Sequence, residues 1–257
     1  MTYWIELEGG ETAAAEIEAL AGTKGTSHVL WVFNEEEVEL VRRARGHGLA
    51  VVPIVPNLAA YVRDTTGGGP IAAMLRRFRR LPLASQARLL LANVRNASGI
   101  LGQDFAVGLS ILAEMELRQL APLGAESVAL TSAVVDLAIA LNSRRVIVRL
   151  LNLIEQRFGY RAILETANLG ITASKLCEWG LRMDRLRLLA AANPAGYGMR
   201  PDQKLCELVI RSGRVNVVTR DIDASGQVTV TAALEYQRRL GIDSCVISRR
   251  LLAAGLV

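Results

Sequence analysis

The chain has 257 residues, of which 51% are hydrophobic and 21% charged, and its formal net charge is +5. That length and composition allow one large domain or two small ones with a sizeable core. No apolar run reaches the roughly 18–20 residues of a membrane helix, and the N-terminus MTYWIELEGG lacks the basic-then-apolar order of a secretory signal. We therefore expect a cytoplasmic protein with no membrane partner.

Eight short apolar segments are predicted to be strands, and each precedes an amphipathic helical pattern. In chain order they are Tyr3–Glu8, His28–Asn34, Leu49–Val55, Ser127–Ser132, Arg161–Asn168, Arg185–Asn193, Val215–Asp221 and Ser244–Ser248. Strands that alternate with helices pair in parallel, and eight of them in a chain of this length predict an α/β fold, a (β/α)8 barrel of the TIM type, with residues 1–257 as a single domain.

A doubly wound open sheet is the alternative fold. It is disfavoured because no strand is followed by GxGxxG, or by GxxxxGK with Ser or Thr, the two glycine fingerprints of nucleotide binding. For the same reason we expect no nucleotide cofactor.

The segment between the third and fourth strands, residues 56–126, is longer than one barrel helix requires. Its pattern predicts helices over Pro70–Leu81, Leu83–Arg95 and Gln103–Leu120. We interpret the segment as a helical insertion over the catalytic face, serving as a lid or as an element through which the chain forms a homo-oligomer. Helical padding on the outer wall remains open.

Arginine carries most of the positive charge, and its densest cluster is Arg76, Arg77, Arg79 and Arg80 in MLRRFRRLP. Acidic residues are interleaved with the arginines along the helical segments. We therefore interpret this cluster as a solvated helix face, and we do not expect nucleic acid as a partner. The three cysteines are scattered and form no CxxC pair, so neither a disulfide nor a zinc site is expected.

Polar residues within or directly after the strands are the main functional signal. Helices cover the outside of a parallel barrel, so a polar side chain within a strand is expected to point into the lumen. In the first strand, Trp4, Glu6 and Glu8 are expected inward. For the fifth and seventh strands the register stays open. In the fifth, either Glu165 or the pair Thr166 and Asn168 points into the lumen. In the seventh, either Arg220 or the set Thr219, Asp221 and Asp223 points into the lumen.

Four further strand ends carry a polar residue, namely Asn34, Asn57, Asn193 and Arg249. The loop NPAGYGMRPD, which begins at Asn193, adds Tyr197 and Arg200. Each residue alone could be a helix cap or a turn residue. Together they would surround the C-terminal mouth of a barrel, where the active sites of this fold lie.

Two loops resemble known ion-binding patterns. DIDASG, from Asp221, matches the start of a calcium loop, but the twelfth position is Ala232 instead of a glutamate, and a strand leads in where a helix is required. The sequence therefore does not predict an EF-hand. DTTGGGP, from Asp64, could hold an anion at a helix start, or serve as a hinge.

Several chemistries are disfavoured by what the strands lack. No lysine lies in a strand, which argues against a Schiff-base aldolase. His28 lies at the N-terminal face and His47 near a helix end, which argues against histidine-bound zinc. The remaining candidates are carboxylate and arginine side chains, and reactions that use them are typical of lyases and isomerases.

The strand–helix rhythm resembles the (β/α)8-barrel enzymes as a class, over essentially the whole chain. The turn Asp-Ile-Asp-Ala-Ser-Gly is loosely similar to strand-end turns in the phosphate-binding barrels of amino-acid biosynthesis. The chain departs from those enzymes after its last two strands. No glycine phosphate loop follows the seventh strand, and only SRRLLAAG follows the eighth.

These observations predict a lyase or isomerase that acts on a small anionic metabolite, either phosphorylated or carboxylated. The predicted catalytic residues are Glu6, Glu165, Asp221 and Tyr197. The predicted substrate-binding residues are Asn34, Asn193, Arg200, Arg220 and Arg249. Mg²⁺ or Mn²⁺ is expected on Glu165, Asp221 and Asp223. A metal-dependent hydrolase and a non-catalytic, partner-binding barrel are the alternatives.

Overall fold

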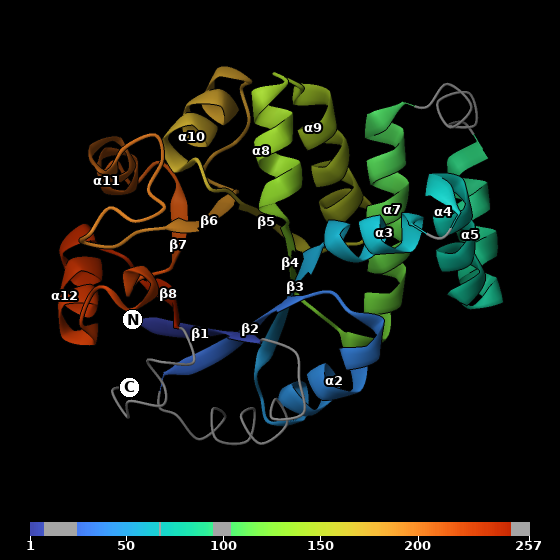
Figure 1. The fold of residues 1–257 in the computed structure, drawn as a ribbon, viewed down its shortest axis with the longest axis horizontal. Helices are drawn as coiled ribbons and strands as arrows, with labels where there is room; N and C mark the ends of the chain where they lie inside the picture. Colours follow the sequence, from blue (N-terminus) through green and yellow to red (C-terminus); the bar gives the residue numbers. More distant parts are fainter. Residues whose placement is uncertain (8–24, 67, 95–103, 248–257) are drawn as a thin grey trace.

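The eight strands close into a parallel barrel in chain order, with the last strand beside the first (Figure 1). The computed structural model describes residues 1–7, 25–66, 68–94 and 104–247. The strands are β1 (Thr2–Leu7), β2 (Thr26–Val32), β3 (Ala50–Val55), β4 (Ser127–Leu130), β5 (Arg161–Glu165), β6 (Arg187–Ala191), β7 (Asn216–Arg220) and β8 (Ser244–Ile247). The predicted fold class is confirmed.

Helices surround the barrel in Figure 1 and connect its strands. The α-helices are α2 (Val38–Gly46), α3 (Leu58–Thr65), α4 (Gly69–Arg80), α5 (Leu83–Asn93), α7 (Phe105–Leu120), α8 (Ser132–Ala140), α9 (Arg144–Asn152), α10 (Leu169–Glu178), α11 (Gln203–Arg211) and α12 (Val230–Leu240). Short 3₁₀-helices are η1 (Glu35–Glu37), η3 (Ala121–Leu123) and η5 (Ala224–Gly226), and a π-helical turn, η4 (Leu153–Arg157), continues α9. Side-chain caps begin several of them, as at Asp104, Asp202 and Thr229.

Between β3 and β4 lie α3, α4, α5 and α7, grouped on one side of the molecule (Figure 1). Three of these helices agree with the predicted ranges, and α3 was not expected. The interpretation of this segment as an insertion with a lid or assembly role stays a prediction. Within the described residues, no helix combines the length and apolar character needed to cross a lipid bilayer.

The barrel lumen is filled by one layer of apolar side chains to which every strand contributes. The layer consists of Trp4, Leu30, Val52, Ile54, Ala129, Ile163, Leu189, Val218 and Val246. Because side chains alternate along a strand, residues two positions away from this layer also face the lumen. The register of the whole barrel follows from this one layer.

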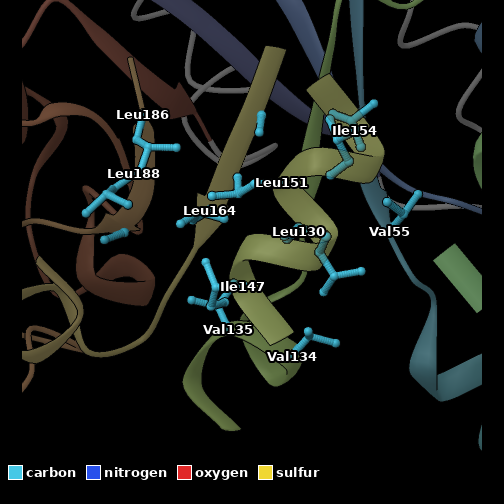
Figure 2. Close-up of a cluster of buried hydrophobic side chains, with 14 of the residues drawn as sticks. Val55, Leu130, Val134, Val135, Ile147, Leu151, Ile154, Leu164, Leu186 and Leu188 are labelled. Carbon is cyan, nitrogen blue, oxygen red and sulfur yellow. The ribbon is translucent and has the colours of Figure 1, made fainter. Parts of the chain in front are cut away.

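The outer faces of the strands pack against the helices in the main core. Figure 2 shows Leu130 of β4 and Leu164 of β5 facing Val135 of α8 and Ile147 of α9. All four side chains are fully buried. Burial of such side chains contributes about 1.5–3 kcal/mol each, so these contacts stabilise the wall behind β4 and β5.

The alternation resolves both registers that the sequence left open. Glu6, Glu165 and Arg220 each stand two residues beyond a member of the lumen layer, on the C-terminal side. Thr219 faces outward, where its hydroxyl donates to Gln237 Oε1 of α12 at 2.8 Å. The lumen therefore receives Glu165 and Arg220.

The arginine cluster of α4 is not wholly a solvated face, and the prediction is wrong for Arg77. This side chain is buried, its Nη1 lies 3.0 Å from Glu116 Oε1, and its Nε lies 2.8 Å from Asp64 Oδ2. Glu116 also accepts from the backbone N–H of Asn57. The ion pair joins α3, α4 and α7 at the end of β3, which explains why an arginine here is buried.

Candidate active site at the barrel mouth

An arginine crosses the C-terminal end of the lumen. Arg220 Nη2 lies 3.1 Å from both carboxylate oxygens of Glu6, and its Nη1 donates to Glu165 Oε1. β1 and β5 are four strands apart, on opposite sides of the eight-stranded ring. Arg220 from β7 therefore bridges the two walls and closes the lumen above the apolar layer.

The charges around Arg220 stabilise its cationic form. Burial alone would lower the pKa of Arg220, but the carboxylates of Glu6, Glu165 and Asp221 raise it above its ordinary value. The guanidinium is therefore a permanent charge at every accessible pH. Its hydrogen bonds fix the two glutamates in orientation.

Glu165 is held at both of its oxygens. Oε1 accepts from Arg220, and Oε2 accepts from the backbone N–H of Ser132 at 2.8 Å, in the first turn of α8. A helix N-terminus favours a negative charge. The residue is only 6% exposed, so this carboxylate is a fixed part of the mouth and not a mobile side chain.

A cavity of about 320 Å³ lies beside this network, at the C-terminal ends of β5, β6 and β7. It is lined by Ser132, Glu165, Thr166, Ala167, Ala191, Tyr197, Gly198, Arg200, Arg220 and Asp221. Its volume is at the lower end of the roughly 300–1,000 Å³ typical of small-molecule pockets. Arg200 is exposed at the cavity, and within the described chain no carboxylate pairs with its guanidinium.

The loop after β6 is organised by Asn193 and presents Tyr197 to the cavity. Asn193 Oδ1 accepts from Tyr197 N–H at 2.8 Å, and Asn193 Nδ2 donates to the carbonyl oxygens of Tyr197 and Asp221. Asn193 is fully buried and does not line the cavity. Asn193 thus holds the backbone of this loop from below, while Tyr197, which is 45% exposed, lines the cavity.

The DIDASG turn bends the chain sharply at the end of β7. Asp221, Ala224 and Ser225 all have positive φ angles, between 50° and 57°. Such angles are uncommon for residues other than glycine, and they concentrate at functional sites. The side chain of Asp221 is 42% exposed and approaches Arg220 Nε at 3.5 Å. It is thus the least buried carboxylate of the mouth.

Other predicted site residues lie elsewhere. Asn34 accepts from Glu36 N–H and caps η1, away from the cavity lining. Asp223 is buried in the turn and does not line the cavity. Glu8 and Arg249 lie outside the described residues. The sequence reasoning missed Ser132, whose signal would have been its position at the strand-to-helix junction after β4.

The residues at the mouth do not fit the expected Mg²⁺ or Mn²⁺ site as they stand. Both oxygens of Glu165 are occupied by Arg220 and Ser132, so a metal ion would compete with a guanidinium. Among residues 1–7, 25–66, 68–94 and 104–247, no group of three or more histidine, cysteine or acidic side chains is placed to hold an ion. Metal binding stays a prediction, which elemental analysis of the purified protein tests.

No protein-family model matches this chain, and no curated protein matches it in sequence. A similar solved structure is that of nitroalkane oxidase from Streptomyces ansochromogenes, with a TM-score of 0.45 and 15% sequence identity. The match covers 98% of this chain and 66% of the oxidase, so this chain spans less than two thirds of that protein. A likeness this distant carries no functional argument.

Proposed function

We propose that the protein is an enzyme, a lyase or isomerase, that moves a proton on a small anionic metabolite bound at the barrel mouth. The observation that carries the proposal is a small cavity lined by Asp221, Tyr197 and Arg200, the last of which has no carboxylate partner among the described residues. Proton-transfer groups close to an anion-binding group are what such reactions require.

Arg200 is the proposed anion-binding residue. The charge of Arg220 is already offset by Glu6, Glu165 and Asp221, so this guanidinium has little attraction left for a further anion. Arg200 lines the same cavity without such a partner among the described residues. A phosphate or carboxylate group can accept two hydrogen bonds from its planar guanidinium.

Asp221 is the proposed general base, because it is the most accessible carboxylate of the cavity. It takes a proton from a carbon next to a carbonyl group; the electron pair of that C–H bond forms a C=C bond, and the carbonyl π electrons move to oxygen to give an enolate. In an isomerase that acts on a hydroxy carbonyl compound, the hydroxyl proton passes to the enolate oxygen and the hydroxyl carbon becomes the new carbonyl. The former carbonyl carbon takes a proton from Tyr197, and the proton on Asp221 then restores the phenol. In a lyase, the enolate expels a leaving group from the adjacent carbon.

Glu6 and Glu165 act through Arg220. They hold its guanidinium across the lumen, where Arg220 Nε lies 3.5 Å from Asp221 Oδ2. A catalytic group that is held in position before the reaction does not have to be ordered during it. The two glutamates are therefore positioning residues in this proposal, and Asp221 and Tyr197 are the catalytic ones.

The test is proton exchange, which does not require the complete reaction to be known. Pyruvate, 2-oxoglutarate and dihydroxyacetone phosphate are incubated with the protein in D₂O, and loss of the C–H signal next to the carbonyl is followed by ¹H NMR. We expect exchange above the protein-free rate, with a loss of about 100-fold in Asp221→Asn. Arg200→Gln should raise the concentration needed for half-maximal exchange.

Arg214→Gln is the matched control. Arg214 is exposed like Arg200 but precedes the N-terminal end of β7, at the opposite end of the barrel. Exchange that persists unchanged in Asp221→Asn would contradict the proposed base. An effect of Arg214→Gln as large as that of Arg200→Gln would show that only the net charge matters.

A further inference from the structure

A second cavity lies on the outer wall of the barrel, at the opposite end from the mouth. It has a volume of about 380 Å³ and is lined by residues of α5, the end of α7, and the segments just before β4 and β5. The lining residues are Ser85, Arg88, Arg118, Ala121, Gly124, Arg157, Phe158 and Tyr160. We refer to it as the outer-wall pocket.

Two of its arginines are held in place by a buried carboxylate. Glu114 is 1% exposed, and its Oε1 accepts from Arg118 Nε at 3.0 Å while its Oε2 accepts from Arg157 Nη1 at 2.8 Å. Asn93 Nδ2 also donates to Oε2, at 2.9 Å. The carboxylate is therefore saturated, and it orients both guanidinium groups without being exposed to a ligand.

The pocket keeps a positive charge after this pairing. Two guanidinium groups face the single charge of Glu114, which leaves one positive charge in excess. Arg88 adds a second, because it is exposed on α5 and no carboxylate of the described residues pairs with it. A doubly charged anion would match the formal charge of the pocket.

The floor of the pocket is shaped by a glycine and a further arginine. Gly124 has φ +55°, and a Cβ added there would lie 2.4 Å from Arg45 Nη1. Arg45 Nη1 donates to the carbonyl oxygen of Leu123 at 2.6 Å. Any larger residue at position 124 would displace this guanidinium, so the local geometry depends on the missing side chain.

Aromatic rings form the apolar part of the lining. The rings of Phe158 and Tyr160 are stacked, with centroids 6.1 Å apart and planes inclined by 11°. Arg118 Cζ lies 5.7 Å from the centroid of the Phe158 ring. A ligand with an anionic group and a flat apolar group could therefore place one on the arginines and the other on the rings.

We propose that the outer-wall pocket binds a phosphate monoester, with the phosphate on Arg88, Arg118 and Arg157 and the organic group against Tyr160. A monoester carries close to two negative charges at neutral pH and presents several acceptor oxygens to guanidinium groups. The site is separate from the mouth, and the proposal does not depend on the reaction performed there.

The test is isothermal titration calorimetry with phenyl phosphate and inorganic phosphate on the full chain. Arg88→Gln removes the unpaired charge and leaves the Glu114 network intact, so the variant is expected to fold. We expect it to weaken both ligands about tenfold, equal to about 1.4 kcal/mol. Tyr160→Leu should weaken phenyl phosphate while leaving inorganic phosphate unchanged.

Arg200→Gln is the control that separates this pocket from the mouth. It should leave phenyl phosphate binding unchanged, even if exchange at the mouth is lost. The proposal is overturned if folded wild-type protein binds neither ligand at millimolar concentration. It is also overturned if Arg88→Gln and Tyr160→Leu have no effect, or if Arg200→Gln abolishes phenyl phosphate binding.

Discussion

The ion network across the mouth predicts that Arg220→Met lowers the free energy of unfolding. Methionine keeps much of the apolar stem but removes the charge, so Glu6 and Glu165 are left on opposite walls without their shared partner. Removing one partner of a buried ion pair costs about 3–5 kcal/mol. The Arg220 side chain is 23% exposed and that of Glu6 31%, so we expect a loss at the lower end, about 3 kcal/mol.

The loss should depend on pH, and the sign follows from the carboxylates. Without the guanidinium, the negative charges of the two glutamates are left on the lumen walls, and burial disfavours a charge without a partner. Protonation at low pH removes these charges, so the deficit decreases as pH falls. The deficit of Arg220→Met should therefore be full at pH 7.5 and at most about half as large at pH 4.5.

Urea unfolding at these two pH values, followed by tryptophan fluorescence, measures the deficit. Arg187→Met is the matched control, since Arg187 faces the same lumen from the N-terminal end of β6. Burial, and then the charge of Arg161, lowers the pKa of Arg187, so its charge is unfavourable there. We expect the control to cost far less. An equal, pH-independent loss in both variants would refute the reasoning.

Three further predictions concern other parts of the molecule. Burial raises the pKa of Glu116 to about 8. The stability of the wild type should therefore fall as pH rises from about 5 to 8, by at most about 1.4 kcal/mol per pH unit. Glu116→Gln should flatten this dependence, as measured by urea unfolding. Burial and then Arg187 lower the pKa of His28, and Arg187→Met should raise it in an NMR titration. The predicted self-association has its best candidates in Leu90 and Leu91, 60% and 76% exposed on α5. Replacing both with Gln should make a concentration-dependent oligomer monomeric in analytical ultracentrifugation, whereas a monomeric wild type would contradict the prediction.

Much of the fold could be predicted because local patterns determine it. Each strand is an apolar run of five or so residues between a polar loop and an amphipathic helix, and such runs are visible one at a time. The inward position of Glu6 also followed from local alternation with Trp4. The predicted strand ends ran too far where a polar residue belongs to the next turn, as at Asn168 and Asn193.

The burial of Arg77 could not be predicted, because it depends on a partner far along the chain. Glu116 lies 39 positions away on α7, and α4 by itself has four arginines of which any could face solvent. Only the packing of α4 against α7 decides which arginine meets the buried carboxylate. The contact of Arg118 and Arg157 with Glu114 could not be predicted either, because Arg157 lies on a different element and reaches Glu114 only through packing.

At the mouth, the closure of the barrel between β8 and β1 changes which residues are the better candidates for catalysis. Read singly, Glu6 and Glu165 are costly buried carboxylates, and a metal ion is one way to stabilise them. The cation that the structure supplies is Arg220, which is separated from Glu6 by 214 positions and comes close to it only because β8 pairs with β1. Once that closure is known, the glutamates have a partner. The accessible carboxylate of Asp221 then becomes the better candidate for proton transfer, which is why exchange in Asp221→Asn, and not in Glu165→Gln, is the informative comparison.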